Sequence, residues 1–159
     1  MLDRRQIHTV IDTLIREARI RSVSDIHITE GMPVWYRIHG CLTQARDVLK
    51  EYDIREVLLG MMNEKQRKQF EDGQDVDFAW QTTDGCRQRV NIFCEQKKIA
   101  ATIRLLNQHI PTLEELKIPT TLYQLSEEPR GIILVTGPTG SGKSTTLAAV
   151  IEAMNQKYD

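Results

Sequence analysis

The stretch GPTGSGKS at Gly137–Ser144 fits the pattern G-x-x-x-x-G-K-[ST], the P-loop that wraps the phosphates of a nucleoside triphosphate. A side chain at Gly140 or Gly142 would block the approach of backbone N–H groups to phosphate oxygens, or forbid a positive φ. The Lys143 ammonium is expected on the β- and γ-phosphates, and the Ser144 hydroxyl on the Mg²⁺ ion that bridges them. The residues predicted to hold ATP and Mg²⁺ are Gly137, Pro138, Thr139, Gly140, Ser141, Gly142, Lys143, Ser144 and Thr145.

The segments on either side of this loop favour a nucleotide site over a glycine-rich turn that happens to carry a lysine. Residues 131–136, GIILVT, predict a strand buried on both faces. Residues 144–154 predict a helix with one apolar stripe of Leu147, Val150, Ile151 and Met154. Strand, loop and helix in this order direct the positive end of the helix dipole toward a phosphate.

The composition is that of a folded chain outside the membrane. It has 159 residues, 40% of them hydrophobic and 27% charged, with a formal net charge of −1. The near balance of charge argues against a broad nucleic-acid surface, so no nucleic-acid partner is expected. The cysteines Cys41, Cys86 and Cys94 form no C-x-x-C pair and are interpreted as reduced thiols. The N-terminus has no signal-peptide core, and no apolar run approaches the roughly 20 residues of a membrane span. We therefore expect a cytoplasmic location.

Before residue 107 the hydrophobic pattern predicts helices mixed with consecutive hairpin strands. A first helix buries Ile7 to Ala18 and turns Asp12 away from the core. Gly60 is expected to weaken the next helix, which breaks near Met62. The predicted strands are 22–29, 34–39, one starting at 41, 75–81, 87–96 and 99–106, and the further helices start at 54 and 63 after capping residues. The pattern predicts an antiparallel α+β domain over residues 1–107.

Residues 108–130 have the pattern of a linker. A capping box at Thr112–Glu115 predicts a short helix, and Pro119 and Pro129 interrupt the periodicity. Residues 131–159 then begin a P-loop ATPase domain that is incomplete.

With these segments identified, the chain resembles the PilT-type twitching-motility (type IV pilus retraction) ATPases of the secretion-ATPase superfamily. Only one helix precedes Ser24, and the chain has no C-x-x-C pair, which favours the retraction type over pilus-assembly or type II secretion ATPases. Those assembly and secretion ATPases remain the alternative. The similarity lies in Ser24–Ile28 with Gly31, Pro33, Arg37, Ile38 and Gly40, in Met62–Lys68 with Asp77 and Phe78, and in Pro129–Ala149.

The resemblance implies a ring-shaped, usually hexameric, ATP-driven motor that pulls pilin subunits from the pilus. Such a motor works through a platform protein of the inner membrane, at whose cytoplasmic face it would lie. The family's fold implies a PAS-like N-terminal domain followed by a RecA-like α/β ATPase domain. Members of the family also place arginines of the N-terminal domain near the triphosphate, and Arg89 and Arg104 match those positions. Together with Lys143 they are the predicted catalytic residues. The alternative is that both arginines are solvated at strand edges.

The family's Walker B segment, acidic boxes and histidine box lie downstream of the region that this chain resembles. We therefore expect a fragment of a motor whose intact form is an ATPase and which is inactive alone. A single strand and helix cannot bury their own apolar residues, so residues 131–159 are expected to be poorly ordered, packed on the N-terminal domain or paired with another copy. A second hypothesis is a truncated, non-catalytic module that binds ring neighbours or the membrane platform.

Overall fold

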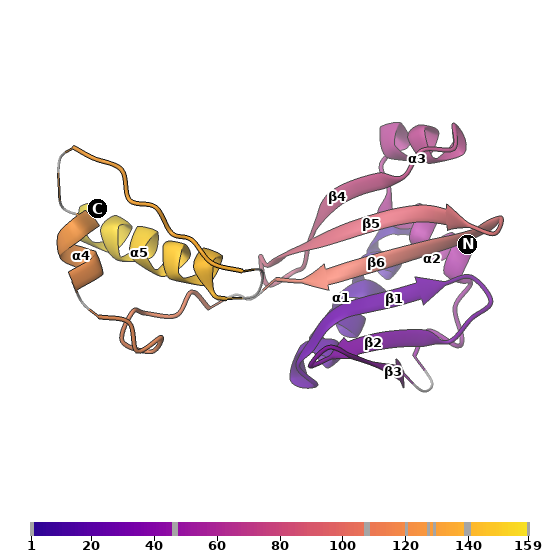
Figure 1. Cartoon of the computed structure of the whole chain (residues 1–159). Coiled ribbons are helices and arrows are strands. Elements are labelled where there is room, and N and C mark those ends of the chain that lie inside the picture. Colours follow the sequence, from indigo (N-terminus) through magenta and orange to yellow (C-terminus); the bar gives the residue numbers. More distant parts are fainter. Residues whose placement is uncertain are drawn as a thin grey trace. The chain divides into compact units, whose positions relative to one another are not determined.

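A computed structural model divides the chain into two compact units, Met1–Leu106 and Asn107–Asp159 (Figure 1). The structure describes residues 2–45, 48–106, 109–119, 121–126, 128, 130–138 and 141–158. Within these ranges, none of the helices combines the length and the apolar character that a membrane crossing requires. The PAS-like character of the first unit and the assignment of 108–130 as a linker stay predictions.

The first unit is a six-stranded antiparallel sheet with three helices, as the α+β prediction requires. The strand order is β3-β2-β1-β6-β5-β4, so the first and last strands of the domain pair at the centre of the sheet. The helices are α1 (Arg4–Ile20), α2 (Ile54–Met61) and α3 (Glu64–Glu71), and the strands are β1 (Val23–Thr29), β2 (Val34–Ile38), β3 (Cys41–Ala45), β4 (Val76–Gln81), β5 (Arg87–Glu95) and β6 (Lys98–Leu105).

One face of this sheet forms the core, because α1 and α2 cover it (Figure 1). Alternate residues of each strand point to that face. Their apolar side chains pack against α1 and α2. The apolar residues of each helix recur with the helical period and therefore lie along one side of it. The opposite face, which we call the open face, carries the other residue of each alternation, most of them polar. Members of the core include Ile11, Leu14, Ile15, Ile26, Ile28, Val57, Leu58, Val90, Ile92, Ala101 and Ile103.

The prediction for Asp12 was wrong, because this residue of α1 has a buried side chain. Asp12 is only 6% exposed, and its Oδ2 accepts a hydrogen bond of 2.8 Å from the backbone N–H of Thr83. The turn between β4 and β5 thus supplies the donor that makes burial of a carboxylate tolerable. The N-terminus of α1 is fixed by a capping box between Asp3 and Gln6, which the sequence analysis did not identify.

Gly60 has a packing role in α2. A Cβ atom at this position would lie 2.0 Å from Cδ1 of the buried Ile7, so glycine lets α1 approach α2 closely. The helix ends at Met61 with Met62 as its C-cap, which confirms the predicted break. Asn63 then begins α3 through a capping box with Gln66, also as predicted.

In the second unit, the helices are α4 (Thr121–Ser126) and α5 (Lys143–Tyr158), which pack on each other. The capping box at Thr112 is present: its N–H donates to Oε2 of Glu115 at 2.9 Å, and the N–H of Glu115 donates to the Thr112 hydroxyl at 3.1 Å. However, the segment after it makes only turns, which end at Lys117 with a φ of +54°. The predicted helix at this point was wrong, and α4, which follows it, was missed.

The predicted strand at residues 131–136 was also wrong. The segment has no regular secondary structure, and Ile132 and Leu134 are 86% and 80% exposed. A strand needs a neighbour that supplies hydrogen bonds to its N–H and C=O groups. Among the described residues, no segment pairs with it, so its apolar sequence alone does not produce a strand.

Candidate functional site

The side chain of Lys143 reaches back to the start of the predicted phosphate-binding loop in the second unit. Its Nζ donates hydrogen bonds to the carbonyl oxygens of Gly137 at 2.7 Å and of Pro138 at 2.6 Å. The backbone N–H of Ser141 donates to the carbonyl of Pro138 at 3.3 Å. These contacts tie the ammonium of Lys143, the first residue of α5, to the first two residues of the loop. Two predicted site residues, Thr139 and Gly140, lie outside the described residues.

The loop backbone requires its glycines. Gly142 has a φ of +86°, a conformation that L side chains rarely adopt, which confirms the expectation for this position. Gly137 has a φ of +150°, and a Cβ atom there would lie 2.8 Å from Oγ of Ser141. A larger residue at either position would therefore change the path of the loop.

The loop leads directly into the N-terminus of α5. The bond from the N–H of Thr146 to the carbonyl of Gly142, 2.9 Å long, closes the first turn. Ser144 and Thr145 in this turn are exposed. The first N–H groups of a helix have no acceptor within the helix, and the dipole gives this end a partial positive charge. Backbone N–H groups, one ammonium and one hydroxyl thus belong to one short segment. N–H groups and an ammonium can donate to phosphate oxygens, and a hydroxyl oxygen can bind Mg²⁺.

The two predicted arginines belong to the first unit, where the structure brings them together. Arg89 of β5 and Arg104 of β6 are direct cross-strand partners on the open face. The guanidinium groups of both arginines are hydrogen-bonded to carboxylates. Nε of Arg104 donates to Asp25 at 2.8 Å, and Nη2 of Arg89 donates to Asp77 at 2.7 Å. Arg37 of β2 lies 3.8 Å from the other oxygen of Asp25.

The two carboxylates were not predicted as site residues. Burial raises the pKa of Asp25, but hydrogen bonds from Arg104 and Ser24 outweigh it and leave this pKa below its usual value. The hydrogen bond from Arg89 lowers the pKa of Asp77. Both carboxylates therefore stay charged at neutral pH. A signal was present in the sequence, because each aspartate lies at an outward position of its strand, next to inward apolar residues.

His27 of β1 also lies on the open face. Its Nδ1 lies 3.3 Å from the hydroxyl of Thr102, and burial together with the nearby charge of Arg37 lowers its pKa. A neutral imidazole at neutral pH follows, so His27 adds no positive charge to the arginines.

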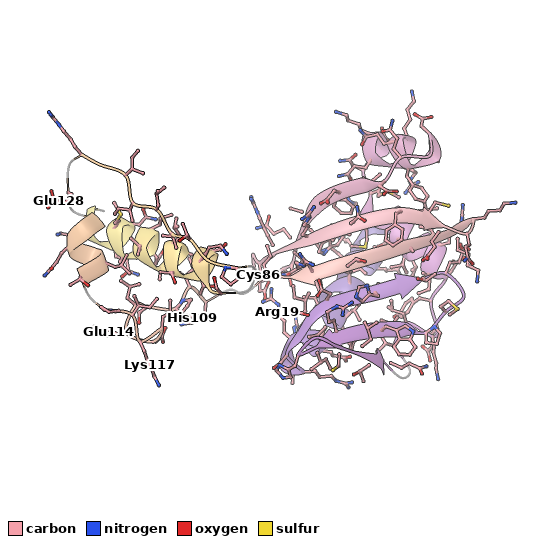
Figure 2. The ribbon with its side chains drawn as sticks, viewed as in Figure 1. Arg19, Cys86, His109, Glu114, Lys117 and Glu128 are labelled. Carbon is pink, nitrogen blue, oxygen red and sulfur yellow. The ribbon has the colours of Figure 1, made fainter. Side chains whose placement is uncertain are left out.

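The end of the sheet next to the arginines is held by one side chain of α1 and one of β5. Figure 2 shows Arg19 of α1 and Cys86 before β5 at the end where β6 stops. Nη2 of Arg19 donates to the carbonyl of Leu106 at 3.4 Å. The N–H of Leu106 donates to Oε1 of Gln88, a fully buried side chain, at 3.0 Å. These two bonds fix the chain where it leaves the first unit.

Comparisons with known proteins agree with the resemblance seen in the sequence. The family described as Type II/IV secretion system protein matches residues 1–159. A Pseudomonas aeruginosa relative described as type IV pilus retractation ATPase PilT is 36% identical over 150 residues, 93% of this chain and 44% of the relative. A Neisseria gonorrhoeae relative described as twitching motility protein is 37% identical over 147 residues, 91% of this chain and 39% of the relative.

A solved structure shares both sequence and fold with the chain. It is described as the pilus retraction motor PilT with bound ADP, is 37% identical, and superposes with a TM-score of 0.78 over 91% of this chain and 43% of that chain. The chain thus spans less than half the length of these relatives. The chain belongs to the family of type II/IV secretion system proteins.

Proposed function

We propose that Gly137–Thr145 binds ATP with Mg²⁺ as part of the ATPase that drives retraction of type IV pili. The observation that carries this proposal is the ammonium of Lys143, which lies at the N-terminus of α5 and is hydrogen-bonded to the carbonyl oxygens of Gly137 and Pro138. The 37% identity to a retraction motor with bound ADP supports the same assignment. The retraction direction, as opposed to pilus assembly or type II secretion, is supported by the descriptions of the Pseudomonas aeruginosa relative and of the solved structure.

On nucleotide binding, the loop residues would replace contacts within the loop by contacts to the phosphates. Lys143 would give up the carbonyls of Gly137 and Pro138 for the β- and γ-phosphate oxygens, and the first N–H groups of α5 would donate to the same anion. The Ser144 hydroxyl would hold Mg²⁺, which when bound neutralises charge on the bridging phosphate oxygens. A guanidinium of Arg89 or Arg104 would neutralise charge that develops on the γ-phosphate.

The wider setting follows the family. The intact protein would be a hexameric ring at the cytoplasmic face of the inner membrane, acting on pilin through a platform protein. By itself the 159-residue chain is expected to bind nucleotide without turnover. The reason is that P-loop enzymes take an acidic magnesium ligand and a water-positioning group from other strands.

The test is nucleotide binding to the 159-residue chain by calorimetry with ADP and Mg²⁺. The change Lys143→Ala should weaken binding by about 10- to 100-fold, because a hydrogen bond to a charged group contributes roughly 1.5–3 kcal/mol. Lys157→Ala is the matched control, since it removes the same charge from the last turn of the same helix and should leave the affinity unchanged. Equal binding by the Lys143→Ala variant and the native chain would refute the proposal.

A further inference from the structure

The last residue of the first unit, Leu106, is held by hydrogen bonds to its backbone. Strand pairing does not reach it, because β6 pairs with β1 only as far as Arg104 and with β5 only as far as Leu105. Its side chain is 47% exposed and does not belong to the core. Both of its backbone groups nevertheless have partners. The N–H donates to Oε1 of Gln88 at 3.0 Å, and the carbonyl oxygen accepts from Nη2 of Arg19 at 3.4 Å.

Gln88 occupies a position of β5 where the strand pattern favours an apolar residue. It alternates with Val90 and Ile92, which are buried in the core, and its own side chain is completely buried. Its partner across the strands is Trp80 of β4, another core residue. An apolar side chain at this position would need no hydrogen-bond partner. A glutamine here departs from the local pattern, and such departures are expected where a residue has a role other than packing.

The two side chains that hold Leu106 each carry a buried N–H group that lacks an acceptor. An N–H group can only donate, so the amide of Gln88 must present Oε1, and not Nε2, to the backbone of Leu106. Among the described residues, neither Nε2 of Gln88 nor Nε of Arg19 has a hydrogen-bond partner, although both atoms are buried. A buried donor without an acceptor is unfavourable. Packing and stability of the first unit alone therefore do not explain this pair of side chains.

We propose that Gln88 and Arg19 are positioning residues that together form a junction clamp, which extends the rigid part of the first unit one residue beyond β6. Gln88 is its stronger member, because its bond to Leu106 is shorter and its side chain is fully buried. Arg19 is the weaker member, with the longer bond.

The junction clamp connects three elements at the boundary of the unit. Leu106 continues β6, Gln88 belongs to β5, and Arg19 lies in the last turn of α1. A displacement of the chain beyond Leu106 therefore acts on α1, β5 and β6 together, and not on the end of β6 alone. All residues of the clamp lie in the first unit, so it does not depend on nucleotide binding by the loop.

The test is amide hydrogen exchange of the 159-residue chain without nucleotide, followed by NMR. Gln88→Met removes the amide and keeps an unbranched side chain of similar length. The exchange rate at Leu106 should rise about 2- to 10-fold, which is the effect of one hydrogen bond of ordinary net strength. The rate at Ile103, a core residue of β6 that is paired on both sides, should not rise, because methionine suits a core position.

Two results with Gln88→Met would overturn the proposal. One is an unchanged exchange rate at Leu106. The other is an equal rise at Leu106 and Ile103, since Gln88 would then stabilise the whole unit and not its last residue. Arg19→Met should raise the Leu106 rate by a smaller factor. No effect of this change, or an effect larger than that of Gln88→Met, contradicts the role of Arg19 as the weaker member.

The matched control is Gln81→Met, the same substitution in the neighbouring strand. Gln81 is exposed, and its Nε2 donates to the carbonyl of Gly85 at 3.2 Å. This change removes a glutamine hydrogen bond without touching Leu106, and should leave the Leu106 rate unchanged. A measurement on the native chain covers the case in which Gln88→Met does not fold. The Leu106 amide of the native chain should exchange much more slowly than in the unfolded chain, and equal rates would show that no clamp forms.

Discussion

Apolar sequence typical of a strand forms a buried strand in the first unit and an exposed, irregular segment in the second. In the first unit, Ile26 of β1 is completely buried, while Leu134 of the second unit is 80% exposed, although both lie in short runs rich in β-branched residues. β1 has hydrogen-bonded neighbours on both sides, β2 and β6. Residues 131–136 have no strand partner among the described residues. Side-chain character therefore predicts where a strand can form, while a hydrogen-bonded neighbour decides whether it does.

Alanine substitutions at these two apolar positions should differ strongly in their effect on the free energy of unfolding. Ile26→Ala should lower the free energy of unfolding of the 159-residue chain by about 2–5 kcal/mol, since it leaves a cavity in the core. Leu134→Ala should change it by no more than about 0.5 kcal/mol, because the side chain is already exposed to water. Urea unfolding followed by circular dichroism measures both. A comparable loss in the two variants would mean that residues 131–136 are packed in solution.

One glycine in each unit is required for a different physical reason. Gly60 of the first unit is needed for space, because a Cβ would overlap Cδ1 of Ile7. Gly60→Ala should lower the free energy of unfolding by up to about 2 kcal/mol, since overpacking costs about 1–3 kcal/mol and alanine regains about 1 kcal/mol of helix propensity. Adding Ile7→Val removes the overlapping atom, so the double variant should be more stable than the sum of the single changes. Additive losses would contradict this packing role.

Gly142 of the second unit is needed for its backbone conformation instead. Among the described residues other than its two chain neighbours, no atom lies within 4 Å of the Cβ that alanine would add, but its φ is +86°. The cost of Gly142→Ala, about 1–2 kcal/mol for a left-handed residue, is therefore not relieved by trimming any neighbour. Here the measurement is ADP affinity, because the strain lies in the loop. If a smaller side chain nearby restores binding, the conformational explanation is wrong.

Most elements of the first unit could be predicted because their side chains alternate or repeat with a clear period. The pairing of β1 with β6 could not, because Asp25 and Arg104 are far apart in sequence and only the closed sheet brings them together. Burial of Asp12 depends on a donor from Thr83 in a distant turn, which no local pattern reveals. The loop around Lys143 follows from its motif, since backbone geometry there is fixed by glycines and not by distant partners.

Two capping boxes, one in each unit, differ in charge. Asn63 and Gln66 form a neutral box at α3, while Thr112 and Glu115 form a charged box before α4. The backbone N–H of Thr112 and the nearby imidazole of His109 lower the pKa of Glu115 below its ordinary value of 4.5. A lowered pKa means that the carboxylate stabilises the turn above pH 4.5, and that this stabilisation is lost as the pH falls through the folded-state value.

The amide proton shifts of Thr112 and Asn63, followed by NMR from pH 7 downward, measure the difference. The Thr112 signal should titrate with a midpoint below pH 4.5, and the Asn63 signal should stay constant, because an amide side chain does not ionise in this range. Glu115→Gln is the matched control, since it keeps His109 and converts the charged box into a neutral one like that of Asn63. If the Thr112 signal still titrates in that variant, then His109 or another group governs the turn, and the two boxes differ for a reason other than the charge of Glu115.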